Sequence, residues 1–346
     1  MMTTLRTFLV AALAALSAGA AHAAAFEAKT MRESLSAREV ERSLLIGKGW
    51  LEFGLGNDLK IAHGAWSPTG EATTWRLPGA PASDQVTWTH TTQRLDLRYG
   101  ITRRGELYWT IKTHYLRLQN DTLGTDLGQF GLGDPRFGYK YELFRSQAPL
   151  TSVIAFAEYK APAGNEAPGN YVGGPTTFSS FIMTTGTPDA EAGLRFKRQV
   201  GPLAVLGGAS YTRRFSSIVQ YVIETDLNQF GGRIKPGDLT KADLGLMVQL
   251  GPVAVDGAAL FQSRQATQIG NTAPGIVASR DLTDVVDSDG WALDARTGVT
   301  LHITRGVDLV GSALVPIRGE DLGFFPIEDI HPTRGNTYSG TLEFRY

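Results

Sequence analysis

Charged side chains recur at every second position in several segments of this chain, and this spacing indicates what chemistry they can do. Arg94, Asp96 and Arg98 stand two residues apart, and Asp294 and Arg296 repeat the pattern. Side chains two apart lie on one face of a β-strand, so each set would project from a single face. Rings of such charges line aqueous pores and set the field that a passing solute crosses. The candidate pore-lining residues are Arg94, Asp96, Arg98, Lys112, Arg136, Lys140, Glu142, Glu191, Arg195, Lys197, Asp243, Asp294 and Arg296.

Nucleophilic chemistry has weaker support. A lipid hydrolase on a barrel needs a serine beside a histidine. His63 and His90 lie at the ends of expected strands, and neither has a serine two residues away. The chain has no cysteine, which excludes disulfides, thiolate metal sites and a cysteine nucleophile. We predict no catalytic residue, no metal site and no cofactor, and keep a lipid hydrolase as an alternative.

Four aspartates form an acidic segment ahead of one expected strand: Asp281, Asp284, Asp287 and Asp289. Carboxylate oxygens this close could hold Ca²⁺, or Mg²⁺ that bridges lipopolysaccharide phosphates. The spacing of an EF-hand and its terminal glutamate are absent. A solvated acidic loop is therefore the alternative, and the sequence leaves both open.

Twelve segments alternate apolar and polar residues, and these are the predicted strands that position the charges. In one of them, Phe137, Tyr139 and Tyr141 alternate with Gly138 and Lys140. A Lys or Arg that faces lipid costs about 2–4 kcal/mol at the bilayer midplane, so the charged face must point inward. Each segment reaches the roughly 9–11 residues that a tilted spanning strand needs. The segments are 45–61, 87–101, 106–118, 134–144, 150–161, 189–200, 203–215, 239–250, 253–265, 291–303, 307–315 and 337–346.

A few apolar residues break this parity. Ile154 and Phe156 share the inward face of Glu158 and Lys160, and Leu116 shares that of His114. Either the lumen has an apolar patch, or a β-bulge shifts the register.

The connections between these segments alternate in length. Five are short, at 102–105, 145–149, 201–202, 251–252 and 304–306, and six are long, at 62–86, 117–133, 162–188, 216–238, 266–290 and 316–336. Outer-membrane barrels have short periplasmic turns and long external loops. With an even number of strands, both termini are expected in the periplasm.

The last strand carries a second signal. One face is apolar and aromatic and the other polar, as expected with lipid outside and water inside. The ending also resembles the C-terminal signal by which the barrel-assembly machinery recognises bacterial outer-membrane barrels. The residues of this expected insertion signal are Tyr338, Gly340, Leu342, Phe344 and Tyr346.

The N-terminus is typical of an exported protein. Arg6 precedes an apolar run at 8–16, and small residues lead to Ala21-His22-Ala23. This is the pattern of a secretory signal peptide, and the run is too short to span a bilayer. We predict a signal peptide at 1–23, a periplasmic N-terminal segment at 24–43 and an outer-membrane β-barrel at 44–346.

Composition agrees with this organisation. A formal net charge of −1 gives no reason to expect nucleic acid as a partner. A length of 346 residues would suggest two soluble domains, yet no Pro/Ser-rich hinge divides the chain, and one barrel absorbs that length. The 40 glycines fit many strands joined by turns. The fold class predicted is all-β, an antiparallel up-and-down transmembrane barrel of about twelve strands.

One stretch resembles a known family. A Gly-x-Gly-Asp turn, a Lys-Tyr pair on the next strand and a Pro-x-Gly after the following strand are similar to the signature of the outer-membrane transporter family named for the meta-pathway of phenol degradation. The resemblance covers about a tenth of the chain and implies small aromatic compounds as solutes. Its residues are Gly131, Gly133, Asp134, Lys140, Tyr141, Pro162 and Gly164.

The function predicted is passive or substrate-preferring passage of small solutes through a Gram-negative outer-membrane porin, with aromatic compounds as the solutes that the resemblance implies. Expected partners are outer-membrane lipid and lipopolysaccharide, the barrel-assembly machinery and the solutes themselves. The alternative is a structural or envelope barrel with a plugged lumen, because inward charges can also pair across the interior and brace it.

Overall fold

The computed structural model describes residues 44–67, 69–74, 87–120, 125–147, 150–163, 170–172, 177–178, 186–224, 228–270, 282–284, 289–304, 306–320 and 333–346. The predicted signal peptide and the N-terminal segment 24–43 lie outside these residues. Among the described residues, no helix is long and apolar enough to cross a membrane.

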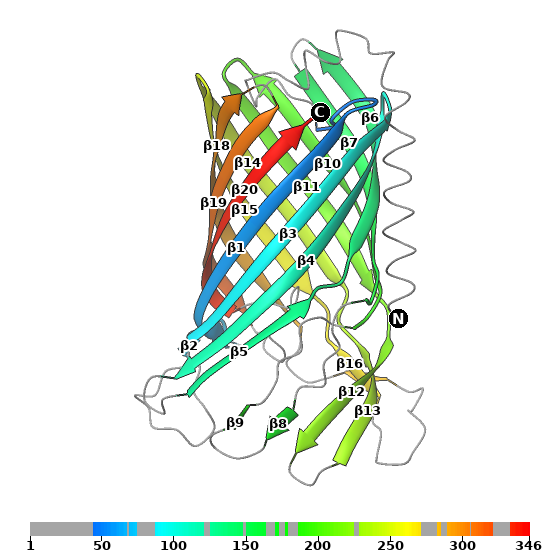
Figure 1. Ribbon diagram of the computed structural model, residues 1–346, viewed down its shortest axis with the longest axis vertical. Coiled ribbons are helices and arrows are strands. Elements are labelled where there is room, and N and C mark those ends of the chain that lie inside the picture. Colours follow the sequence, from blue (N-terminus) through cyan, green and yellow to red (C-terminus); the bar gives the residue numbers. More distant parts are fainter. Residues whose placement is uncertain are drawn as a thin grey trace.

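Twelve antiparallel strands form a closed barrel (Figure 1). The first strand pairs with the last on one side and with the next barrel strand on the other, so no edge remains open. The barrel strands are β1 (Leu51–Trp66), β3 (Thr87–Thr102), β4 (Gly105–Asn120), β6 (Arg136–Gln147), β7 (Leu150–Lys160), β10 (Asp189–Val200), β11 (Leu203–Arg214), β14 (Leu239–Leu250), β15 (Val253–Arg264), β18 (Gly290–Thr304), β19 (Val307–Glu320) and β20 (Thr333–Arg345).

Every predicted segment overlaps one of these strands, and the predicted fold class is confirmed. β10 and β14 begin and end at their predicted residues. The largest difference is in β1, which begins at Leu51 instead of Leu45. Gly47 and Gly49 adopt φ angles of 89° and 80°, a left-handed conformation that interrupts an extended strand before Leu51.

The two ends of the barrel differ. The short connections and Tyr346 lie at one end, which we call the turn end (Figure 1). Gly201 and Gly251 take φ angles of 63° there, which suits glycine in tight hairpin turns. The opposite end, which we call the loop end, carries the long connections.

The long connections contain strands that the sequence analysis did not predict. Their segments pair because backbone donors and acceptors satisfy one another in a ladder. β5 extends the barrel wall by pairing with β4, and β2 pairs with β1. A second sheet forms beyond the loop end from the remaining six (Figure 1). The eight strands found in the long connections are β2 (Ala72–Thr74), β5 (Thr125–Leu132), β8 (Asn170–Val172), β9 (Thr177–Phe178), β12 (Ser217–Glu224), β13 (Asn228–Lys235), β16 (Gln268–Gly270) and β17 (Thr283–Asp284).

Apolar and charged side chains separate to the two faces of the wall. Leu244 and Leu246 are 60% and 58% exposed on the outside, whereas Glu106 is fully buried. Ile154 and Leu116, which broke the parity, are also buried. β7 pairs with β10 without a register shift, and the shift in its pairing with β6 lies in β6, between Glu142 and Phe144. Of the two readings left open, an apolar patch inside the barrel is therefore correct at these positions.

Candidate functional site

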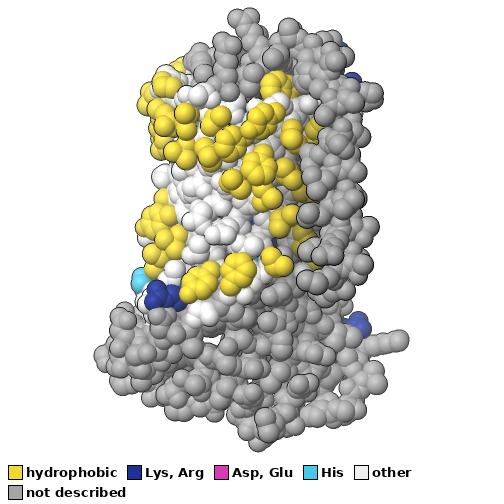
Figure 2. Space-filling view, in the orientation of Figure 1, with side chains coloured by type: hydrophobic (Ala, Val, Ile, Leu, Met, Phe, Trp, Pro, Cys, Tyr) yellow, Lys and Arg dark blue, Asp and Glu magenta, His cyan; other side chains and the backbone are white. Residues whose placement is uncertain are grey.

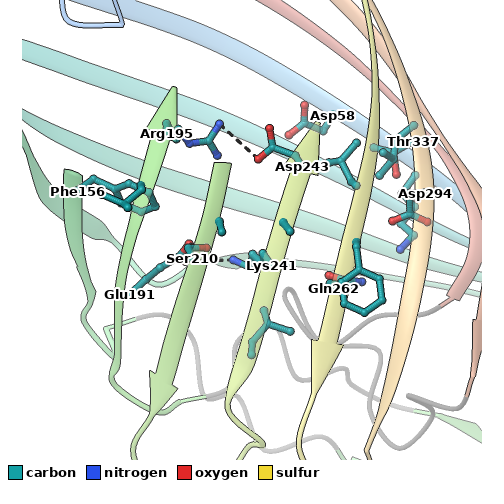
Figure 3. A pocket seen from close by; sticks show the side chains of 18 of the residues that line it. Asp58, Phe156, Glu191, Arg195, Ser210, Lys241, Asp243, Gln262, Asp294 and Thr337 are labelled. Atoms are coloured by element: carbon teal, nitrogen blue, oxygen red, sulfur yellow. Dashed lines mark hydrogen bonds and ion pairs between the residues drawn. The ribbon is translucent and has the colours of Figure 1, made fainter. Parts of the chain in front are cut away.

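A cavity of about 460 Å³ lies inside the barrel (Figure 3). Its walls come from ten of the twelve barrel strands, which surround the axis, so the space belongs to the interior. The polar and charged lining residues are Asp58, Lys60, His90, Thr92, Glu191, Arg195, Ser210, Lys241, Asp243, Gln262, Asp294 and Thr337, and Phe156 supplies an aromatic ring.

One wall of the cavity carries paired charges (Figure 3). Lys241 Nζ lies 3.1 Å from Glu191 Oε2, and Ser210 donates a hydrogen bond of 2.7 Å to the same carboxylate. Arg195 Nη1 lies 4.0 Å from Asp243 Oδ1, and the Arg195 side chain is 53% exposed. The Arg195 guanidinium also lies 5.9 Å from the centre of the Phe156 ring. This wall thus offers a loosely held cation beside an aromatic face.

Other charges in the cavity are less satisfied. Within the described residues, neither Lys60 nor Asp294 has an ion-pair partner within 4.0 Å, although each feels the other's charge. Asp58 Oδ2 accepts a hydrogen bond of 3.3 Å from Arg94, but the buried Asp58 Oδ1 has no partner among the described residues. These groups can therefore interact with a solute or with water.

The turn end of the interior is different, because its charges bind one another. Arg98 Nη1 lies 2.5 Å from Glu52 and Arg98 Nε lies 2.9 Å from Glu106, which also binds Lys140 at 2.8 Å. Arg345 binds Glu52, and its Nη1 lies 2.5 Å from Asp308. We call these six residues, Glu52, Arg98, Glu106, Lys140, Asp308 and Arg345, the turn-end network. It joins strands β1, β3, β4, β6, β19 and β20.

The residues that precede β1 fold into this end of the barrel. Arg98 Nη2 donates a hydrogen bond of 3.0 Å to the Leu44 carbonyl, and the Ile46 amide donates one of 3.0 Å to Glu106 Oε2. Leu45 is 5% exposed and Trp50 is also buried. Because Arg98 and Glu106 point inward, residues 44–46 occupy interior space at the turn end, whereas Lys48 is exposed and the Gly49 and Trp50 backbones bond to Gly100 of β3. The sequence analysis had assigned residues 45–50 to a strand in the wall, which is wrong.

The loop end has its own buried cluster. Lys160 Nζ lies 2.7 Å from Asp189 and 3.5 Å from Asp134. Asp238 accepts hydrogen bonds from the Arg214 amide at 2.9 Å and from the Tyr211 hydroxyl at 2.7 Å. These contacts tie together the ends of neighbouring strands below the cavity.

The predicted pore-lining residues divide among these regions. Arg98 and Lys140 belong to the turn-end network, whereas Glu191, Arg195, Asp243 and Asp294 line the cavity. Five others lie in four ion pairs elsewhere: Arg94 with Asp96 at 2.5 Å, Arg136 with Glu158 at 2.9 Å, Glu142 with Arg145 at 3.8 Å, and Arg296 with Asp256 at 3.7 Å. Lys197 is buried and Lys112 is half-buried.

Sequence reasoning missed Asp58, Lys60 and Phe156 as residues of the cavity. The signal was present, because Asp58 and Lys60 stand two residues apart in the first predicted segment, the spacing that places charges on one face of a strand. Both lie near the predicted end of their segment, whereas β1 continues to Trp66. Phe156 was noted only as a break in the pattern.

The residues of the insertion signal face outward. Tyr338 is 48% exposed and Tyr346 is 70% exposed, and the Phe344 ring centre lies 6.4 Å from that of Phe53. In the family-like motif, Asp134 contacts Lys160 and Lys140 contacts Glu106. Gly131 and Gly133 are buried, Tyr141 and Pro162 are exposed, and Gly164 lies outside the described residues.

The histidines weighed for a hydrolase have other partners. His63 Nδ1 lies 3.3 Å from the Thr87 hydroxyl, and His90 Nε2 lies 2.9 Å from His114 Nδ1. Within the described residues, no group of three or more His, Cys, Asp or Glu could hold a metal ion. Asp281 and Asp287 of the acidic segment lie outside those residues, so its cation-binding reading stays a prediction.

The fold is similar to that of solved bacterial barrels. The COG4313 outer membrane channel from Pseudomonas putida F1 matches with a TM-score of 0.60 at 12% identity, over 88% of this chain and 97% of that chain. The translocator domain of the autotransporter NalP from Neisseria meningitidis gives 0.45 at 9% identity over 86% and 88%. The TodX monoaromatic hydrocarbon channel deltaS2 mutant gives 0.41 at 9% identity over 86% and 88%. No family model and no curated protein matches the sequence. The first likeness shows the fold, a barrel of the outer-membrane type.

Proposed function

We propose that this chain is an outer-membrane channel for small polar solutes. The observation that carries the proposal is the charged cavity inside a closed wall whose outer face is apolar. Lys60, Asp294 and Arg195 offer both signs of charge to a solute, and such a lining tunes passage by charge and size. The outer membrane, with both termini in the periplasm, is the location that this architecture fits best.

We propose small hydrophilic compounds as the solutes, and we propose that small aromatic compounds also pass. An aromatic solute could stack on Phe156, and a carboxylate on it could pair with the nearby Arg195 guanidinium. The resemblance to the phenol-pathway family supports the same extension. Outer-membrane lipid, lipopolysaccharide and the barrel-assembly machinery complete the proposed partners.

The test uses cysteine labelling, since the chain has no native cysteine. Thr337→Cys puts a thiol into the cavity, and Tyr338→Cys puts one on the opposite face of the same strand. In planar bilayers, a negatively charged methanethiosulfonate should reduce the conductance of Thr337→Cys and leave that of Tyr338→Cys unchanged. Equal responses of the two variants would contradict an open, water-filled lumen.

A plugged barrel is the second candidate, because residues 44–46 occupy the turn end. If that segment narrows the path, then Leu45→Ser with Ile46→Ser should loosen it, since each loses burial worth about 1.5–3 kcal/mol. The double variant should conduct more than the wild type in single-channel records. Silence of both proteins, with normal heat-modifiable folding, would favour the plugged barrel.

A further inference from the structure

The outer face of the barrel has a row of small and polar side chains within its apolar band. The strand register sets Gly340 opposite Asn57, Asn57 opposite Gln93, and Gln93 opposite Thr113. Gly311 lies opposite Gly340 at the other end of the row. We call these five residues the amide row. Figure 2 shows a pale zone on this face, between two zones of hydrophobic side chains.

The amide row points away from the interior. Asp58 and Arg94, the next residues along β1 and β3, bind each other inside the barrel, so Asn57 and Gln93 face outward. Both are exposed. The neighbours on the same face of β1 are Leu55 and Leu59, and Leu55 is 49% exposed. The amides therefore lie among residues that suit lipid.

The hydrogen-bonding groups of these amides are mostly unused. Thr113 donates a bond of 3.3 Å to Gln93 Oε1. In the part of the chain that the structure describes, the Asn57 side chain has no hydrogen-bond partner, and neither does the Gln93 amide nitrogen. Acyl chains can neither donate nor accept hydrogen bonds, so polar groups at this depth need a partner from outside the barrel.

We propose that the amide row is a contact surface for a second copy of this chain in the membrane. A carboxamide carries both donors and an acceptor, so two identical patches related by a two-fold axis can satisfy each other. A charged partner would instead bring an unpaired charge into lipid. A Cβ built on Gly340 would have no atom within 4 Å, which leaves room for a neighbouring wall to approach closely.

The first test again exploits the absence of cysteine. Asn57→Cys and Gln93→Cys place thiols in the row, and Leu244→Cys places one on β14, an outward position far around the barrel. After mild oxidation in membranes, the two row variants should migrate as disulfide-linked dimers, and Leu244→Cys should stay monomeric. Dilution with added lipid should not abolish the cross-link. Equal cross-linking at all three positions, or none in the row, would overturn the proposal.

A second measurement separates association from folding. Asn57→Leu with Gln93→Leu keeps an outward apolar face, so the barrel should fold normally. Its dimer, sized in nanodiscs cut from native membranes, should be lost, while its single-channel conductance should persist. A double variant as dimeric as the wild type, or a monomeric wild type, would refute the contact. Either result leaves the channel proposal standing, since conductance is read separately.

Discussion

The turn-end network and the cavity use the same kinds of residue in opposite ways. At the turn end, Glu106 is fully buried and binds both Arg98 and Lys140. In the cavity, Lys60 has no ion-pair partner within 4.0 Å among the described residues, and Arg195 is 53% exposed. The position of a charge in the alternating pattern therefore predicts that it faces the interior, but not whether it braces the barrel or lines the cavity. Two features distinguish charges that brace the turn end from charges that line the cavity: how close an opposite charge lies, and whether the segment that precedes β1 packs against them.

The largest effect is expected from Glu106→Gln. This change removes a fully buried carboxylate, which leaves half-buried Lys140 without an ion-pair partner among the described residues and Arg98 with Glu52 alone. Breaking a buried pair typically costs about 3–5 kcal/mol. Urea unfolding in lipid vesicles should show this loss of unfolding free energy. Glu71→Gln, in an exposed connection, is the matched control and should unfold like the wild type. A Glu106→Gln barrel as stable as that control would end the distinction between the two regions.

An intermediate effect is expected on ion selectivity from the cavity charges. In a salt gradient, the reversal potential of Lys60→Met should shift toward that of a cation-selective channel. The reversal potential of Asp294→Asn should shift toward that of an anion-selective channel. A charge about 4 Å from an ion in water is worth about 1 kcal/mol, which corresponds to about a fivefold change in permeability ratio. Shifts in the same direction for both variants would mean that neither side chain faces the conducting path.

The smallest effect is expected from Arg195→Met on stability. The side chain is 53% exposed, and its contact with Asp243 is long at 4.0 Å. Exposed pairs contribute about 0–1 kcal/mol after screening by solvent. Unfolding in vesicles should therefore resemble that of the wild type, in contrast to Glu106→Gln. A loss as large as that of the buried variant would show that this pair also braces the barrel.

The wall was predictable and the interior contacts were not. β10 and β14 matched their predicted limits because alternation and Gly-Pro turns are local signals. The strands in the long connections were missed, since most of them are short and their pairing depends on segments distant in sequence. Residues 45–50 were assigned to the first strand, although Gly47 and Gly49 stand there in the sequence and interrupt it. Pairing of Arg345 with Glu52, 293 residues away in sequence, depends on the register with which β20 closes the barrel against β1.

The sequence alone determined a twelve-stranded wall with charges inside and apolar residues outside, because a period of two needs only neighbouring residues to be read. Tertiary structure decided which charges meet, since that depends on the closure and stagger of strands distant in sequence. It also decided that residues 44–46 lie in the interior and that Asn57 and Gln93 stand side by side on the outer face. Those juxtapositions exist only once the barrel has closed.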